Sequence, residues 1–350
     1  MPEITAAVLT EIGAPLSLMA LQAPALKPGQ VLVEIAYSGL CHSQLNEILG
    51  RRGPDRFIPH TLGHEGSGIV RAVGDGVTKV APGQRVVLTW IKGTGADVPG
   101  SVYGSADGPV NSGAISTFQS CAVISENRLV PLPDAMALRE AALLGCAVPT
   151  GAGIVFNTLK LQAGQSIAIF GVGGIGLSAL LAARAAGAAP LIAVDVVAEK
   201  LALAASLGAT HTIDARSADV VARVRELTGG KGVDGAVEAA GVPEAMEAAY
   251  LSVRAGGGQC VIAGNVAQGK RLSLDPYDLI VGRRIAGSWG GDTAPDRDIP
   301  HYVDLYRSGR LALDALVSAE FPLDRINDGF AELQSGRIAR ALLQINPQLT

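Results

Sequence analysis

Two cysteines and one histidine of this chain have the residue types of a catalytic metal site, although they lie far apart in the sequence. Cys41 ends the motif SGLC, His64 lies in GHEG, and Cys146 lies in LGCAVPTG. Thiolate sulfur and imidazole nitrogen are ligands that Zn²⁺ favours, and three protein ligands rather than four leave one coordination position open for water or substrate. No other combination of the four cysteines and five histidines has the pattern of a site. These residues predict one zinc ion and metal-assisted redox chemistry.

A glycine-rich turn follows the apolar run at residues 166–170. It reads GVGGIG, in which Gly171 permits a tight turn, Gly173 lets the main chain approach a pyrophosphate, and Gly176 lets a helix pack closely on the strand. The N-terminus of that helix would face the phosphates with unpaired N–H groups. Asp195 ends the next apolar run, where a carboxylate would bind the adenosine ribose and repel a 2′-phosphate. This unit predicts a dinucleotide site that prefers NAD to NADP.

The elements around these motifs are of two kinds. Up to about residue 146, short β-like runs alternate with Gly and Pro turns, at residues 31–37, 68–73, 85–88 and 118–124. From about residue 165, strands alternate with helices. The expected strands cover residues 166–170, 191–195, 211–213, 233–238, 258–263 and 284–288, and the expected helices cover residues 174–186, 198–207 and 217–227. The pattern predicts an α/β chain whose residues 148–288 form a doubly wound parallel Rossmann sheet, with a β-rich catalytic domain at residues 1–147 and 289–350.

Composition narrows the classes of partner. The 350 residues are 17% charged and 48% hydrophobic with a formal charge of −4, so the chain lacks the basic face of a nucleic-acid binder, and a small molecule is the expected partner. The apolar stretch at residues 166–189 contains the glycine turn and Arg184, which indicates a buried strand and helix rather than a membrane span. Four cysteines without regular spacing and the lack of a secretory pattern predict free thiols and a cytoplasmic location.

Taken together, these motifs resemble the zinc-dependent alcohol dehydrogenases of the medium-chain dehydrogenase/reductase superfamily, over nearly the whole chain. GHEG is similar to the family's zinc signature, and the segment around Cys146 is similar to its third-ligand segment. The C-terminal motifs FPL, IN and SG, followed by Arg340, resemble its closing strand and helix. The resemblance implies a GroES-like catalytic domain, hydride transfer between an alcohol or aldehyde and NAD, and a homo-oligomer, either dimer or tetramer.

The resemblance also implies roles for single residues. Cys41, His64 and Cys146 would bind the zinc, Glu65 would lie behind the metal, and Ser43 would relay the proton of the alcohol. The implied cofactor contacts are His42, Gly171, Gly173, Gly174, Gly176 and Arg340 at the pyrophosphate, Asp195 and Lys200 at the adenosine ribose, and Thr150 and Ile175 at the nicotinamide ring. Zinc acts as a Lewis acid that lowers the pKa of a bound alcohol, which prepares its hydride for transfer to NAD⁺.

The sequence departs from the family pattern in three places. Residues 88–120 contain no cysteine, so the four-cysteine structural zinc site of many relatives is absent. Gln44 replaces the acidic residue that supports the zinc-bound histidine, and an amide raises the basicity of the ring less than a carboxylate does. Asn46 replaces a histidine that ends the proton relay, and because asparagine does not take up a proton, water or His42 would have to serve instead.

Two alternative functions remain open at this point. A zinc-free reductase of the same superfamily, acting on quinones or activated double bonds, would not need the three ligands. A non-catalytic relative would account for Gln44 and Asn46. Zinc analysis and a test of NAD-dependent turnover would separate these alternatives from the dehydrogenase.

Several remaining side chains have an ordinary structural interpretation. Cys121 and Cys260 fall in apolar β-like runs, which indicates buried inert thiols. The histidines without a second ligand at metal spacing are His60, His211 and His301. Arg51 and Arg52 fit a solvated surface loop, although either guanidinium could instead bind an anionic group of the alcohol at the channel mouth.

Overall fold

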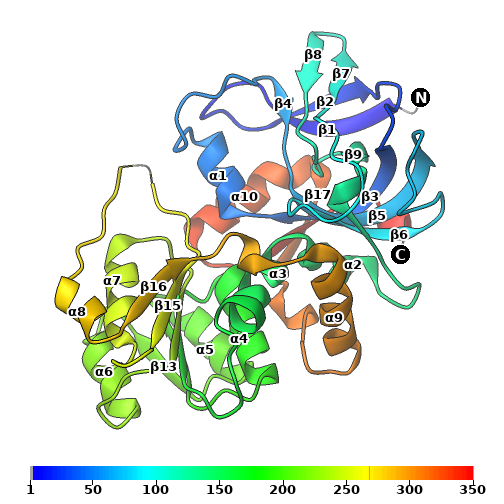
Figure 1. Cartoon of the computed structure of the whole chain (residues 1–350). Helices are drawn as coiled ribbons and strands as arrows, with labels where there is room; N and C mark the ends of the chain where they lie inside the picture. Colours follow the sequence, from blue (N-terminus) through cyan, green and yellow to red (C-terminus); the bar gives the residue numbers. More distant parts are fainter. Residues whose placement is uncertain (1–2, 268, 350) are drawn as a thin grey trace.

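The computed structural model describes residues 3–267 and 269–349. Figure 1 shows two parts, a β-rich part and a parallel sheet flanked by helices, which meet along α3 (Ala147–Gly153) and α9 (Pro295–Arg307). Among the described residues no single helix is long and apolar enough to cross a membrane; one sharply bent pair of helices, Leu138–Gly145 and Ala147–Thr158, passes by length and composition alone.

The β-rich part contains a small barrel and an open sheet. The barrel consists of β1 (Glu3–Leu9), β2 (Ser17–Gln22), β7 (Val102–Ser105), β8 (Gly108–Asn111) and β4 (His60–Thr61). The sheet runs in the order β10 (Leu129–Pro131), β6 (Arg85–Thr89), β5 (Glu65–Val73), β3 (Gln30–Leu40), β18 (Ala341–Gln344) and β17 (Ala319–Pro322), and β9 (Cys121–Ser125) also pairs with β3. Strand β3 is rich in β-branched and aromatic residues and almost wholly buried, as expected for a central strand. Its end delivers Cys41 to the site.

The helical part is a six-stranded parallel sheet in the order β13 (His211–Asp214), β12 (Leu191–Asp195), β11 (Ile167–Phe170), β14 (Gly235–Glu238), β15 (Gln259–Ile262) and β16 (Arg284–Gly287). Its helices are α4 (Gly174–Ala185), α5 (Ala198–Ser206), α6 (Val220–Leu227), α7 (Pro243–Ser252) and α8 (Pro276–Ile280). All six expected strands are present. The chain order reverses between β11 and β14, and ligands of such sheets bind at the carboxyl ends of the strands beside this reversal.

Some expected boundaries differ from the structure for local reasons. Helix α6 begins at Val220 rather than at Ser217, because the Asp219 side chain accepts a hydrogen bond from the backbone N–H of Ala222 and caps the helix there. Strand β9 begins at Cys121 rather than at Phe118. These shifts do not change the order of the elements.

The C-terminal segment returns to the β-rich part, as the sequence predicts. Strand β18 pairs antiparallel with β3, and α10 (Ile326–Ser335) lies beside α1 (His42–Ile48). One buried apolar cluster includes Val148, Leu177, Tyr302 and Leu342, and so continues from the helical part through α9 into the β-rich sheet. This shared core fixes the parts of the site that come from different halves of the chain. The remaining helices of the described residues are α2 (Leu138–Ala141), a π-helical turn at Ile154–Thr158 and several short 3₁₀ turns.

Candidate active site

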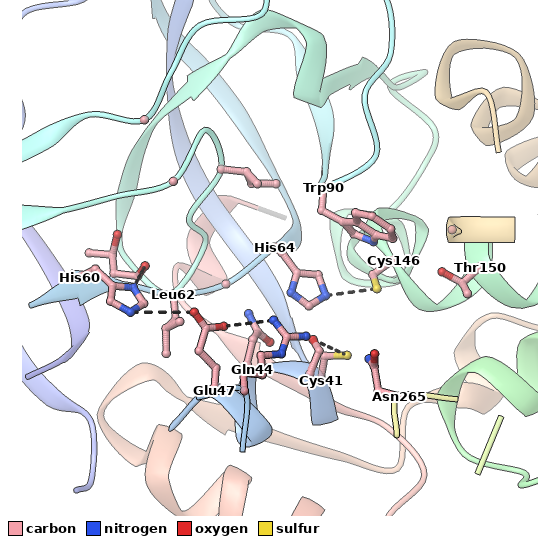
Figure 2. A pocket seen from close by; sticks show the side chains of 18 of the residues that line it. Cys41, Gln44, Glu47, His60, Leu62, His64, Trp90, Cys146, Thr150 and Asn265 are labelled. Carbon is pink, nitrogen blue, oxygen red and sulfur yellow. Dashed lines mark hydrogen bonds and ion pairs between the residues drawn. The ribbon is translucent and has the colours of Figure 1, made fainter. Parts of the chain in front are cut away.

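The three expected metal ligands meet at one point. Cys41 directly follows β3, His64 directly precedes β5, and Cys146 lies between a 3₁₀ turn and α3. Ligand atoms of these residues and Glu65 all lie within 4.8 Å of one another, and Nε2 of His64 is 3.2 Å from Sγ of Cys146. Figure 2 shows the three side chains turned toward one another. Strand pairing therefore assembles residues that are up to 105 positions apart in the sequence.

The electrostatics of this cluster favour a divalent cation. A hydrogen bond with the Cys146 thiol lowers the pKa of Cys41 well below its ordinary value against the effect of burial, and the charges of His64 and Arg340 lower it further. The same contact, together with burial, raises the pKa of Cys146. Of these two thiols, Cys41 thus loses its proton readily, whereas Cys146 retains its proton. A zinc ion would stabilise both thiolates, so the donor set fits the expected metal.

Glu65 and Arg340 form a buried ion pair behind the ligands. Glu65 is fully buried, Arg340 is 4% exposed, and Nη2 of the arginine contacts Oε1 of the glutamate. Nη1 of Arg340 donates a hydrogen bond of 2.9 Å to the carbonyl oxygen of Leu40. A Cβ atom at Gly39 would lie 2.6 Å from the Glu65 carboxyl carbon, so only glycine leaves room for this pair. Arg340 thereby links the metal ligands to the cofactor side.

The first turn of α1 contributes two polar side chains to the cavity. The Ser43 hydroxyl donates a hydrogen bond of 3.3 Å to Sγ of Cys41, and both residues line the cavity. Gln44 is 2% exposed, yet neither atom of its side-chain amide has a hydrogen-bond partner among the described residues. The expected hydrogen bond from Gln44 to His64 is therefore not formed. His64 lacks the support that a carboxylate at this position would provide.

The glycine turn has the conformation that a dinucleotide requires. Gly171 has a φ of +85°, which side chains disfavour, and a Cβ atom there would lie 2.6 Å from the backbone nitrogen of Ala240. A Cβ atom at Gly173 would meet nothing within 4 Å, which leaves space for a phosphate, and one at Gly176 would clash with the carbonyl of Gly171. Helix α4 starts at Gly174, whose nearest neighbours include the Arg340 side chain. The helix N-terminus and a guanidinium therefore face the same space.

Asp195 lies at the end of β12, beneath the glycine turn. Its Oδ2 accepts a hydrogen bond from the backbone N–H of Val172, and its Oδ1 accepts two more from Val196 and Val197. A carboxylate offers about four acceptor positions. Three of them hold the local backbone, and one remains for a ribose hydroxyl.

His42 and Lys200 are close enough to Arg340 to influence one another. Loss of water around the ring lowers the pKa of His42, the Cys41 thiolate opposes this, and the charges of Lys200 and Arg340 lower it further. His42 is exposed as a residue, at the start of α1. Arg340 lies beside the N-terminus of α4, and His42 and Lys200 are near enough to share its electrostatic environment.

A cavity of about 610 Å³ opens from the metal ligands toward the surface. Thr150 and Ile175, the expected nicotinamide contacts, line its wall together with Ser43 and the three ligands. The structure therefore brings the expected catalytic group and the nicotinamide contacts to one cavity. The adenosine contacts lie along the neighbouring edge of the sheet.

Comparisons with known proteins agree with this geometry. Family models described as alcohol dehydrogenase GroES-like domain and zinc-binding dehydrogenase match residues 27–134 and 174–308. The chain is 33% identical to an S-(hydroxymethyl)glutathione dehydrogenase of Photobacterium damsela subsp. piscicida, over 97% of this chain and 98% of that protein. It is similar to the structure of an alcohol dehydrogenase zinc-binding domain protein from Burkholderia ambifaria, with 36% identity, a TM-score of 0.92 and 99% of both chains covered. It is also similar to the structure of benzyl alcohol dehydrogenase from Acinetobacter calcoaceticus, with 32% identity and a TM-score of 0.90. That match covers 99% of this chain and 100% of the other.

The chain belongs to the zinc-dependent alcohol dehydrogenase family. As a member of this family it is an oxidoreductase that transfers a hydride between an alcohol and a nicotinamide cofactor, and its fold combines the GroES-like and Rossmann-type domains.

In this alcohol dehydrogenase a buried carboxylate lies beside the cysteine-free segment. Glu126 is 2% exposed, and its carboxylate accepts hydrogen bonds from the backbone N–H groups of Thr78, Lys79 and Ala96. Burial raises the pKa of Glu126, but these three donors outweigh it and the net shift is downward. One carboxylate thus ties the loop at residues 78–79 to Ala96 of the cysteine-free segment.

The structure corrects the sequence interpretation at His60. This residue is 7% exposed and lines the cavity, with Nε2 2.7 Å from Oδ2 of Asp55. The other two isolated histidines are ordinary, since His211 is exposed and His301 packs against Phe156. Cys121 and Cys260 are also structural, because burial raises their pKa values to about 11 and about 12.

Trp90, Trp289 and Glu47 also line the cavity but carried no sequence signal. Trp90 and Trp289 meet edge to face with ring centroids 5.0 Å apart and form an aromatic wall. Glu47 and Arg52 line the cavity, whereas Arg51 does not and instead donates a hydrogen bond to Asn46. Only the convergence of separate loops reveals these contributions.

Proposed function

We propose that this alcohol dehydrogenase uses NAD rather than NADP and binds one zinc ion per chain through Cys41, His64 and Cys146. The observation that supports the zinc site is the meeting of two thiols and one imidazole at the inner end of a cavity. Bound zinc would supply Lewis acidity toward the oxygen of the alcohol.

The protein's own residues position the reaction. The Ser43 hydroxyl lies beside Cys41, where it can take the proton of the alcohol and pass its own onward. Thr150 and Ile175 would support the nicotinamide ring, so that its hydride-accepting face turns toward the alcohol. Glu65 and Arg340 hold the inner wall, and Arg340 with His42 would neutralise the pyrophosphate.

Asp195 supports the preference for NAD. The residues that follow it, Val196 and Val197, carry no positive charge that could bind a 2′-phosphate. Their amides hold the carboxylate in place, so it would lie close to the ribose. Lys200, in the first turn of α5, would contact the same ribose.

Further proposals concern the whole protein. We propose a catalytic domain at residues 1–147 and 289–350 and a cofactor domain at residues 148–288, in keeping with the two family matches. A homo-oligomer is supported by exposed apolar side chains near the edge strand β16, among them Ile280 at 77% exposure. Four free cysteines support a cytoplasmic location.

The test combines metal analysis with turnover. We expect about one equivalent of zinc per chain, and NADH production with members of a panel of primary, secondary, aromatic and polyol alcohols. Two equivalents of zinc would contradict the single site. A zinc-free protein that reduces quinones or enones instead would contradict the proposed site as a whole.

A further inference from the structure

Glu47, Arg52 and His60 line the cavity apart from the zinc ligands, and Asp55 supports His60 from behind. Glu47 comes from α1, Arg52 and Asp55 from the loop after it, and His60 from β4. Figure 2 shows the ring of His60 turned toward the Glu47 carboxylate, with the zinc ligands further inside. None of the four is required by the roles assigned above.

The ring of His60 is held through both of its nitrogens. Its Nδ1 lies 3.1 Å from the carbonyl oxygen of Thr61, and its Nε2 lies 2.7 Å from a carboxylate oxygen of Asp55. His60 and Asp55 thus form a close pair. Its side chains are only 9% and 13% exposed.

A second metal ion explains these distances less well than a proton does. Two ligands bound to zinc at about 2.0 to 2.2 Å in tetrahedral geometry lie about 3.3 to 3.6 Å apart. The 2.7 Å between His60 and Asp55 is too short for this and is normal for a hydrogen bond to a carboxylate.

Glu47 is the member of the group whose hydrogen-bonding capacity is unused. Its carboxylate oxygens lie 3.9 Å from Nε2 of His60 and 3.8 Å from Nη1 of Arg52, both beyond hydrogen-bond distance. Its side chain is 28% exposed and makes no hydrogen bond to any residue that the structure describes. Arg52 attracts the carboxylate by its charge, and Glu47 lines the cavity with its acceptor positions not used in a hydrogen bond. A group in this state is suited to bind a donor.

The position of Glu47 on α1 sets the distance between its carboxylate and the Ser43 hydroxyl, where the reacting hydroxyl would lie. Ser43 and Glu47 are four residues apart on α1 and therefore share one face of the helix, about 6 Å apart along its axis. Both line the cavity. An alcohol whose reacting hydroxyl lies at Ser43 can thus reach Glu47 with a substituent a few bonds away.

We infer that Glu47 determines substrate specificity by accepting a hydrogen bond from a second donor group of the alcohol, either a hydroxyl or an ammonium. This inference rests on the proposed function, because it places the reacting hydroxyl at Ser43. Arg52 and His60 are positioning residues for the carboxylate. Since Arg52 shares its charge with Glu47, a carboxylate on the substrate would meet repulsion as well as attraction at this wall, so a donor fits better than an anion.

The test compares alcohols of equal length that differ at the far end. The purified enzyme would be assayed for kcat/KM with pentan-1-ol, butane-1,4-diol, 4-aminobutan-1-ol and 4-hydroxybutanoate, and with the homologues that are one and two carbons longer. Wild type is compared with Glu47→Ala and Glu47→Gln. The matched control is Glu332→Gln, which removes a surface carboxylate of α10 that is paired with Arg337.

For Glu47→Ala we expect the ratio of kcat/KM for a diol or amino alcohol to that for the matched alkanol to fall about 10- to 100-fold, at one favoured chain length. Glu47→Gln should restore part of the ratio for the diol and little of it for the amino alcohol, because an amide still accepts a hydrogen bond but carries no charge. Unfolding temperature and zinc content, measured in parallel, identify a variant that is merely misfolded. The control should leave every ratio unchanged.

Different failures have different meanings. If alkanols are oxidised but the ratios in Glu47→Ala equal those of wild type, the inference is overturned and the proposed function stands. If 4-hydroxybutanoate is the best substrate and Arg52→Ala abolishes that preference, the wall binds anions and the role of Glu47 is wrong. If no alcohol is oxidised with either cofactor, the proposed function fails and the inference fails with it.

Discussion

Replacing Asp195 by Ala should weaken the discrimination between NAD and NADP, and the structure indicates how. The carboxylate accepts hydrogen bonds from the Val172, Val196 and Val197 amides, so it is fixed at the end of β12 below the glycine turn. A 2′-phosphate on the adenosine ribose would lie beside it. The substitution removes this fixed negative charge, and it also removes the acceptor for the ribose hydroxyls of NAD.

The expected magnitude follows from the electrostatics. Two unit charges about 4 Å apart interact with about 1 kcal/mol in water and about 4 kcal/mol at the effective dielectric of a protein surface. Because a phosphate monoester carries nearly two charges at neutral pH, the lower figure is a minimum. The ratio of kcat/KM for NAD to that for NADP should therefore fall at least about tenfold in Asp195→Ala.

The assay is steady-state kinetics with both cofactors and one alcohol, at low and high salt. Asp214 ends the neighbouring strand β13 in register with Asp195 and is paired with Arg216, so Asp214→Ala is a matched control that should leave the ratio unchanged. A wild-type enzyme with equal kcat/KM for the two cofactors would refute the role of Asp195. So would an Asp195→Ala ratio equal to that of wild type.

Three further predictions concern the metal site and the cysteine-free segment. Cys146→Ala should abolish turnover and lose zinc while the protein stays folded, as judged by circular dichroism. Gln44→Asp should hold zinc up to about 10- to 100-fold more tightly in competition with a chelator, since the wild-type amide gives His64 no hydrogen bond; equal zinc loss would mean that position 44 does not act on the ligand. Glu126→Gln should lower the free energy of unfolding at neutral pH. Because folding lowers the pKa of Glu126, its stabilising effect is complete above about pH 4.5 and disappears as the pH falls through the folded-state pKa, so urea titrations of the two proteins should converge in acid.

The helical part of the fold was predictable because its signals are local. A buried parallel strand is a short apolar run, and a turn that needs a positive φ requires glycine, so Gly171 and the runs on either side of it identify the sheet from adjacent residues. The barrel of the β-rich part was harder to predict from the sequence. Its strands β7, β8 and β4 are two to four residues long, and such short runs carry little periodicity. Strands β7 and β8 form a hairpin, but the pairs β2–β7 and β4–β8 join segments that are far apart in the sequence.

The residues of the candidate site also differ in whether the local sequence identifies them. Cys41, His64 and Cys146 were identifiable since each lies in a distinctive motif and their residue types share one chemistry. His60 was not, because its partners Asp55 and Glu47 do not stand at any metal or catalytic spacing, and only the packing of α1 against the following loop and β4 brings them together.

The outer wall of the cavity shows how folding separates two neighbouring cations that the sequence does not distinguish. As isolated cations after a helix, Arg51 and Arg52 suggested either a solvated loop or a site for an anionic alcohol. In the fold the two differ: Arg51 donates a hydrogen bond to Asn46 outside the cavity, and Arg52 lies at the cavity with Glu47 3.8 Å away. The charge that a substrate would meet there is set by Arg52 together with Glu47, so the sum over neighbours brought together by folding, and not the sign of one side chain, would govern which substituent of the alcohol is favoured.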